Sequence, residues 1–288
     1  MAKYYLKDLL IEVLGEGYQI IRRMHGGMMN MSYVVKDSNG KLFVVYVPNG
    51  KANKTVNREI EQENTKIMED LDLTSKMIYF DTKRGIKIKE YIEGNSLNNI
   101  QDYDISKVAD LLHRIHDSRK LSPTDYHPFD RLAIYENRAL EYQQESNKYR
   151  KLKDLLSVNF RLLSLKEKVF SHNDFQKSNI IKGLDDSYYV IDFEFAANND
   201  EIYDIAAFAN DSLKDGEELL AAYFNGKLTK EIQQRFYLWR IFISLQWHNV
   251  AIAKHYQKEG EGHKINFLNV AKYFLDLAEE SAQKFLEL

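Results

Sequence analysis

Strand-like and helical patterns occupy separate parts of this 288-residue chain. Before about residue 92, short apolar segments of alternating polarity follow one another, interrupted by one long charged helical pattern. Beyond Gly94, long helical patterns dominate and only two short strand-like pieces interrupt them. Strands followed by helices indicate an α+β fold. The sequence therefore predicts a small antiparallel sheet lobe with one helix, residues 1–92, and a larger, mostly helical lobe, residues 93–288.

Turn signals in the first part support a sheet. Asn39-Gly40 separates two strand-like segments, and this dipeptide is typical of two-residue hairpins. A Glu- and Lys-rich helical pattern follows over residues 53–73, and a last strand-like segment spans residues 86–92. Because no Ser/Gly-rich linker follows that strand, we expect a short hinge just before Gly94.

The composition limits the partners and the environment of the protein. A net charge of −3 gives no reason to expect a nucleic-acid partner. No apolar run approaches the roughly 18–20 residues of a membrane helix, and the first residues form an amphipathic helical pattern rather than a signal peptide. The chain has no cysteine, which excludes disulfides and thiol catalysis. We expect a cytoplasmic protein without membrane insertion, whose oligomeric state the sequence leaves open.

Polar side chains lie within the two strand-like pieces of the helical part. FSHNDFQKSNII (170–181) carries Asp174 and Asn179, and YYVIDFEF (188–195) carries Asp192. A buried carboxylate is costly unless it is paired or bound to a cation. Carboxylate and amide oxygens suit Mg²⁺, which takes its other ligands from phosphate and water. These residues predict phosphoryl transfer, with Asp174 free to accept a proton from an attacking hydroxyl.

These motifs resemble the catalytic and metal loops of the aminoglycoside phosphotransferase and choline/ethanolamine kinase families. The resemblance implies a two-lobed protein-kinase-like fold, and the longer match is similar to bacterial choline kinases. It covers about residues 20–260. Besides the catalytic stretch, the segments that carry it are GGMMNMSY (26–33), VVYVPNGK (44–51), VNREIEQEN (56–64), IDFEFAANNDEIYDIA (191–206) and, more weakly, QWHN (246–249).

The resemblance assigns roles to the residues of the catalytic stretch. It implies that Asp174 is the catalytic base and that His172 supports its loop. Asn179 and Asp192 are then expected to hold Mg²⁺. Glu194 is expected to line the acceptor site or to stand behind the metal ligands.

The same resemblance implies a site for ATP in the first lobe. The loop Gly26–Ser32, which contains Gly27 and Asn30, is expected to cover the phosphates. Backbone groups from Glu90 to Ile92 are expected to hold the adenine. Glu61 corresponds to the helix carboxylate that pairs, in the family, with a basic residue on the third strand. In the other lobe, Asp204 is expected to buttress the loops.

One position departs from the family pattern. The third strand, LFVVYV, carries Tyr46 where the family has Lys or Arg, and a tyrosine supplies no positive charge near neutral pH. Three readings follow: Arg58 or Lys36 compensates, nucleotide binding is weak, or the protein is no longer an active kinase.

The expected acceptor pocket also departs from the pattern. Aromatic rings and a nearby carboxylate recognise quaternary ammonium groups. Phe195 stands where the family usually has tyrosine, and Trp247 is retained. A second expected tryptophan appears as Val250 or Ala251. With Glu194, Phe195 and Trp247 as substrate residues, the small cationic alcohol expected first is choline.

We therefore predict an ATP- and Mg²⁺-dependent kinase that phosphorylates the hydroxyl of a small cationic alcohol. Two alternatives stay open. One is another small-molecule kinase, with ethanolamine, an aminoglycoside or a sugar as acceptor. The other is a kinase-fold binding protein with weak or no activity, which the Tyr46 substitution suggests.

Overall fold

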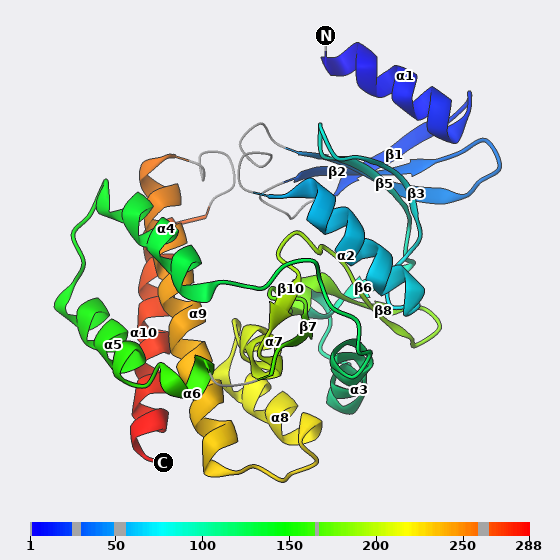
Figure 1. Cartoon of the computed structure of the whole chain (residues 1–288). Coiled ribbons are helices and arrows are strands. Elements are labelled where there is room, and N and C mark those ends of the chain that lie inside the picture. Colours follow the sequence, from blue (N-terminus) through cyan, green and yellow to red (C-terminus); the bar gives the residue numbers. More distant parts are fainter. Residues whose placement is uncertain (1, 25–29, 49–55, 165–166, 259–264) are drawn as a thin grey trace. The chain divides into compact units, whose positions relative to one another are not determined.

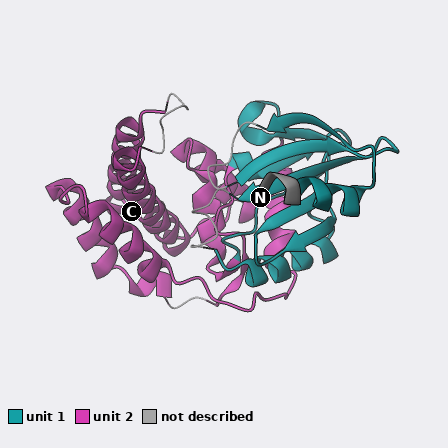
Figure 2. Ribbon diagram, turned by 90° about the horizontal axis from the view of Figure 1, so that it is seen from above, with its two compact units in different colours: residues 1–103, 177–196 teal, residues 104–176, 197–288 magenta. Residues whose placement is uncertain are grey.

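The computed structural model describes residues 2–24, 30–48, 56–164, 167–258 and 265–288 (Figure 1). The chain forms two compact units (Figure 2). Unit 1 consists of residues 1–103 and 177–196, and unit 2 consists of residues 104–176 and 197–288. The lobe boundary predicted near residue 92 falls inside unit 1, and the segment 177–196 returns to unit 1 from the helical half of the sequence.

A five-stranded antiparallel sheet forms the centre of unit 1, with strand order β1-β2-β3-β5-β4. A turn joins β2 and β3 where Asn39-Gly40 predicted one, but it is one residue longer than a two-residue turn, because the Asp37 amide donates to the Lys41 carbonyl at 2.9 Å. The Asp37 carboxylate accepts the Lys41 amide at 2.8 Å, and Gly40 has a φ of +91°. The strands are β1 (Gln19–Met24), β2 (Asn30–Lys36), β3 (Leu42–Pro48), β4 (Met77–Asp81) and β5 (Ile86–Glu90).

The two faces of this sheet differ in chemistry. Helix α1 (Ala2–Leu14) covers the apolar face, where its residues Leu10 and Leu14 join side chains from three strands. Because side chains alternate along a strand, the polar side chains of β3 and β5 lie on the opposite face. The apolar cluster consists of Leu10, Leu14, Val35, Phe43, Val45 and Ile88.

Helix α2 (Arg58–Asp70) is the inserted helix that the sequence predicted. Asn57 begins it, because its side chain accepts the amides of Glu59 and Ile60 at 3.1 and 3.2 Å. Its buried face is largely polar and includes Arg58 and Glu61. A helix that buries charged side chains needs partners for them, and the sheet supplies one on β5.

A second, three-stranded sheet completes unit 1 and joins distant parts of the chain. It has the order β6-β8-β9, with β6 (Gly94–Ser96), β8 (Ile180–Gly183) and β9 (Tyr188–Val190). Gly94 permits this pairing, because an added Cβ would lie 2.3 Å from the Lys182 carbonyl oxygen. The Val190 amide donates to the Leu73 carbonyl at 2.8 Å and ties β9 to the segment after α2.

Unit 2 is mostly helical. Helices α9 and α10 run side by side (Figure 1), and α9 is buried continuously from Arg235 to Leu245, mostly through apolar side chains. Among the described residues, no helix is long and apolar enough to cross a membrane. The helices are α3 (Ile105–His116), α4 (Pro128–Leu140), α5 (Asn147–Val158), α6 (Arg161–Ser164), α7 (Glu201–Phe208), α8 (Leu213–Tyr223), α9 (Lys230–Tyr256) and α10 (Phe267–Leu286).

Two short strands in unit 2 precede the catalytic loop and helix α7. β7 (Val169–Ser171) pairs antiparallel with β10 (Ala197–Asn199). Asp200 then begins α7, since its side chain accepts the Ile202 amide at 3.0 Å. The predicted α+β class, with a small antiparallel sheet region and a larger helical region, is confirmed.

Candidate active site

The loop after β7 is held by one buried carboxylate. Asp204, one turn into α7, accepts the amide of His172 at 2.8 Å and the amide of Asn173 at 2.7 Å. Its side chain is fully buried, and the imidazole of His116 lies 3.2 Å away. Asn173 adopts a left-handed φ of 60°, and its amide group donates to the Ala197 carbonyl at 3.2 Å. The loop conformation is therefore fixed by contacts within unit 2.

Asp174 follows these anchored residues. Its amide donates to Nδ1 of His172 at 3.2 Å, so the buried imidazole accepts a hydrogen bond from the loop. One carboxylate oxygen of Asp174 accepts the Gln176 side-chain amide at 3.2 Å. The residue is half-buried, so the anchored loop presents a partly exposed carboxylate.

Replacing Asp204 with asparagine is expected to lower the free energy of unfolding by roughly 3 kcal/mol. The amide group keeps one acceptor oxygen, whereas the two loop amides and His116 now converge on Asp204. Urea denaturation measures the change. Asp211→Asn is the control, because this residue is exposed and accepts the Tyr273 hydroxyl through its backbone carbonyl, which the substitution keeps; it should change stability by less than about 0.5 kcal/mol. Equal effects of the two substitutions would contradict the anchoring role.

Asn179 and Asp192 both belong to unit 1, and a backbone hydrogen bond joins Asn179 to the residue before Asp192. Asn179 ends the short 3₁₀ helix η3 (Lys177–Asn179), and its carbonyl accepts the Ile191 amide at 2.9 Å. Asp192 has a φ of 70°, a conformation that non-glycine residues rarely adopt and that is frequent at functional sites. Its side chain is about one-third exposed, at 35%.

Charged side chains of unit 1 meet around Glu61 of α2. Nη1 of Arg58 lies 2.6 Å from Oε2 of Glu61, and the ammonium of Lys87 binds the other oxygen. The Lys87 ammonium also lies 4.0 Å from Oδ1 of Asp192. Nη1 of Arg58 lies 3.6 Å from Oε2 of Glu194, which accepts no hydrogen bond from the described residues.

The pKa values in this cluster report opposing effects. Burial by itself would raise the pKa of Glu61, but the charges of Lys87 and Arg58 outweigh it and lower that pKa. Burial, followed by the charge of Asp192, raises the pKa of Glu194 to about 8. Glu61 is therefore ionised at neutral pH, whereas the folded protein favours the protonated form of Glu194.

Lys87 is a residue that the sequence interpretation did not identify. It is the strand partner of Tyr46 across β3 and β5, and its ammonium lies 5.2 Å from the centre of the Tyr46 ring. Burial, and then the charges of Asp192 and Glu61, raise the pKa of Tyr46, so the phenol stays neutral. The signal was in IKIKE, whose alternation places Lys87 on the face opposite Ile88.

The two bases named as possible substitutes for a third-strand lysine have different positions. Arg58 is buried and bonded to Glu61, whereas Lys36 is exposed on β2. A second buried lysine, Lys89, donates to Oγ1 of Thr74 at 2.9 Å. Burial, followed by the charge of Lys87, lowers the pKa of Lys89 to about 7.

A hollow in unit 1 brings several of these groups together. It encloses about 280 Å³ of space, part of which is open to solvent. Strands β3, β4 and β5, helix α2 and the segment after β9 contribute its walls. The lining residues are Tyr46, Glu61, Thr65, Met77, Lys87, Lys89, Ile191, Asp192 and Phe193.

The other residues expected to bind the nucleotide occupy separate positions in unit 1. Gly26 and Gly27 lie outside the described residues. Asn30 and Ser32 are buried at the start of β2. The carboxylate of Glu90 pairs with Lys41, and its amide donates to the Lys76 carbonyl at 2.9 Å. Ile92 is half-buried just before β6.

The expected acceptor residues belong to different units. Glu194 and the half-buried Phe195 lie in unit 1. Trp247 lies on α9 in unit 2, where its ring stacks on Phe274 of α10, with centroids 5.9 Å apart and an interplanar angle of 18°.

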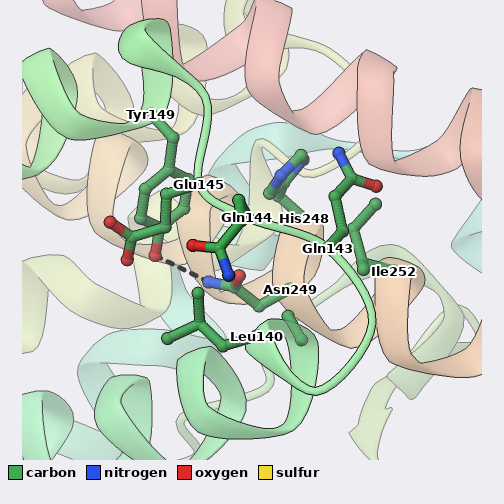
Figure 3. Close-up of a pocket in the computed structure, with 9 residues that line it drawn as sticks. Leu140, Gln143, Gln144, Glu145, Tyr149, His248, Asn249 and Ile252 are labelled. Carbon is green, nitrogen blue, oxygen red and sulfur yellow. Dashed lines mark hydrogen bonds between the residues drawn. The ribbon is translucent and has the colours of Figure 1, made fainter.

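The residues after Trp247 line a separate hollow in unit 2 (Figure 3). It encloses about 250 Å³ and contains side chains from α4, α5 and α9. Asn249 donates to the hydroxyl of Tyr149 at 2.6 Å, as the dashed line in Figure 3 marks. Nδ1 of His248 lies 2.8 Å from the Ala271 carbonyl oxygen, so two residues of the QWHN segment form structural hydrogen bonds.

Comparisons with known proteins connect this geometry to a family. The family described as choline/ethanolamine kinase matches residues 21–240. Protein LicA of Haemophilus influenzae is 28% identical over 214 residues, which are 69% of this chain and 61% of that protein. The chain thus spans less than two-thirds of that relative's length.

Solved structures share the fold at lower identity. The choline kinase LicA from Streptococcus pneumoniae has a TM-score of 0.74 at 22% identity, over 100% of this chain and 99% of that chain. A choline/ethanolamine kinase family protein from Mesorhizobium loti has a TM-score of 0.80 at 16% identity, over 99% of this chain and 97% of that chain. The resemblance read from the motifs is confirmed: the chain belongs to the choline/ethanolamine kinase family, a family of small-molecule phosphotransferases.

Proposed function

We propose that this protein transfers the γ-phosphoryl group of ATP to the hydroxyl of a small cationic alcohol, with choline as the first candidate. The observation that carries the proposal is the anchored loop of Asp174. Two backbone amides of the loop bind the buried Asp204, so the loop that carries the half-buried carboxylate of Asp174 is held in a fixed conformation. Such a carboxylate can accept the proton of a hydroxyl as the phosphoryl group arrives.

The donor set of unit 1 fits Mg²⁺. Asn179 and Asp192 supply one amide and one carboxylate oxygen, and Asp192 has the left-handed backbone that is frequent at functional sites. Within the described residues, no cluster of three or more acidic or histidine side chains forms a protein-only metal cage. A bound Mg²⁺ would take its other ligands from phosphate and water and would neutralise charge on the phosphates.

Glu194, Phe195 and Trp247 stay our proposed contacts for the acceptor. Ring faces attract a quaternary ammonium group, and a carboxylate adds to this attraction. The pKa of Glu194, about 8 in the folded protein, would fall when a cation binds beside it, because a positive charge favours the ionised form. Choline and ethanolamine both supply such a cation.

A panel of alcohols tests the proposal. We expect choline or ethanolamine to give the highest kcat/KM in an assay of nucleoside diphosphate release, run with ATP and with GTP. The panel also contains two polyhydroxylated alternatives, an aminoglycoside, which is cationic, and a sugar, which is uncharged. A higher kcat/KM with either of these would assign the protein to another acceptor class.

The alternative of an inactive binding protein has its own test. A ligand that binds only the folded state raises the thermal midpoint through mass action. We expect Mg-ATP to raise the midpoint, since the buried ammonium of Lys87 lines the hollow of unit 1. No shift at millimolar Mg-ATP, together with no turnover of any acceptor, would favour a scaffold over an enzyme.

A further inference from the structure

The missing cation of the third strand has a replacement on the neighbouring strand. Tyr46 and Lys87 face each other in the pairing of β3 and β5, so their side chains leave the sheet side by side. The Lys87 ammonium lies 5.2 Å from the centre of the Tyr46 ring. The positive charge that β3 lacks is therefore supplied by Lys87 of β5, whose ammonium lies over the Tyr46 ring.

Lys87 has more hydrogen-bonding capacity than its protein partners use. A lysine ammonium has three N–H donors. Among the described residues, the Lys87 ammonium donates one hydrogen bond, to Glu61, while Asp192 is 4.0 Å away. Glu61 already has a second cation, because Arg58 binds its other oxygen at 2.6 Å. The charge of Glu61 is therefore neutralised without Lys87, and yet the Lys87 side chain is only 6% exposed.

The position of this ammonium matches that of a phosphate ligand. Lys87 and Asp192 both line the hollow of unit 1, and Asp192 is the carboxylate proposed to hold Mg²⁺. A phosphate oxygen bound to that ion would lie near the ammonium. Glu61, fixed by Arg58, holds the lysine side chain in place by its other oxygen.

We infer that Lys87 on β5, positioned by Glu61 and by the Tyr46 ring, binds the phosphates of the nucleoside triphosphate in place of a third-strand lysine. This inference rests on the proposed function for the identity of the ligand. Strand β5 would then bind the phosphates, and its end begins the segment from Glu90 to Ile92 that is proposed to hold the adenine. The neutral Tyr46 serves as the surface under the ammonium.

Binding measurements separate this role from a structural one. For Lys87→Met we expect roughly 10- to 100-fold weaker binding of a non-hydrolysable Mg-ATP analogue by calorimetry, since a charge-assisted hydrogen bond is lost. Adenosine should bind as it does to the wild type. Lys83→Met, which changes an exposed lysine in the turn between β4 and β5, is the matched control and should change neither affinity. Equal losses for the analogue and adenosine, or no loss for the analogue, would overturn the inference.

Moving the charge provides a gain-of-function test. The double variant Tyr46→Lys/Lys87→Met returns a lysine to β3 within the same pair of side chains. We expect it to regain most of the lost affinity for the analogue. A folded double variant that binds as weakly as Lys87→Met would overturn the inference.

A labelling experiment on the wild-type protein does not depend on any variant folding. An acyl phosphate of ATP transfers its acyl group to a nearby amine: the lysine nitrogen forms an amide bond, the acyl–phosphate bond breaks, and ATP leaves. We expect mass spectrometry to find the label on Lys87, and excess ATP to prevent it. Labelling of other lysines with none on Lys87 would refute the assignment. Neither the labelling nor the calorimetry needs an acceptor alcohol. If nucleotide binding depended on Lys87 but no acceptor was phosphorylated, the proposed function would be rejected and the inference about Lys87 would stand.

Discussion

Replacing Asp174 with asparagine is expected to lower kcat by about three orders of magnitude, with the KM for ATP changed less than about threefold. The amide has nearly the shape of the carboxylate but cannot accept the proton of the acceptor hydroxyl. The backbone bonds of the loop to Asp204 do not involve the altered group, so the fold should persist. Steady-state kinetics with the best acceptor of the panel measures the change.

Another acidic residue of unit 2 provides the control for this substitution. Asp130 lies exposed in the first turn of α4, and Asp130→Asn removes the same charge from unit 2. Its kcat should equal that of the wild type. If Asp174→Asn kept wild-type turnover while its thermal midpoint was unchanged, the assignment of the catalytic base would be wrong.

Replacing Lys89 with methionine is expected to stabilise the fold by on the order of 3 kcal/mol below pH 7. Burial, and then the charge of Lys87, lower the pKa of Lys89 from 10.5 to about 7, so holding the ammonium in the folded state is unfavourable. Methionine has a similar length and no charge to desolvate. The loss of the hydrogen bond to Thr74 offsets part of the gain.

The pH dependence distinguishes this effect from simple improved packing. Between pH 7 and pH 10.5 the unfolded chain binds more protons at Lys89 than the folded one, so wild-type stability rises with pH across this interval. The methionine variant lacks this rise, and its advantage should be complete below pH 7 and decline toward pH 10.5. Urea denaturation across this range measures both. Lys83→Met, an exposed lysine, is the control, and the same stabilisation in that variant would exclude burial as the cause.

The predicted fold succeeded where the signals were local. Asn39-Gly40 predicted a two-residue hairpin turn, and the structure forms a hairpin at this place between β2 and β3, although three residues separate the paired Asp37 and Lys41. The charged pattern over residues 53–73 produced helix α2, which Asn57 caps through its side chain. Alternation and helical periodicity depend on neighbours a few residues away, and therefore the sequence displays them directly.

The charge arrangement around Glu61 could not be read in the same way. Whether Arg58, Lys36 or Lys87 neutralises Glu61 depends on which strands pair and in what register. The register of β3 with β5 places Lys87 beside Tyr46, although the two residues are far apart in the chain. A shift of the register by one residue would turn Lys87 to the apolar face.

The amino-acid sequence by itself determined the α+β class, the turn between β2 and β3, and the family, because periodicity, turn chemistry and motif order are properties of short segments. The tertiary structure alone decided that the segment 177–196 joins unit 1 and that Glu61 is paired from both α2 and β5. Both outcomes depend on long-range pairing: β8 finds β6, and β5 finds β3. Such pairings are selected by the packing of complete sheets and helices, which no short stretch of sequence contains.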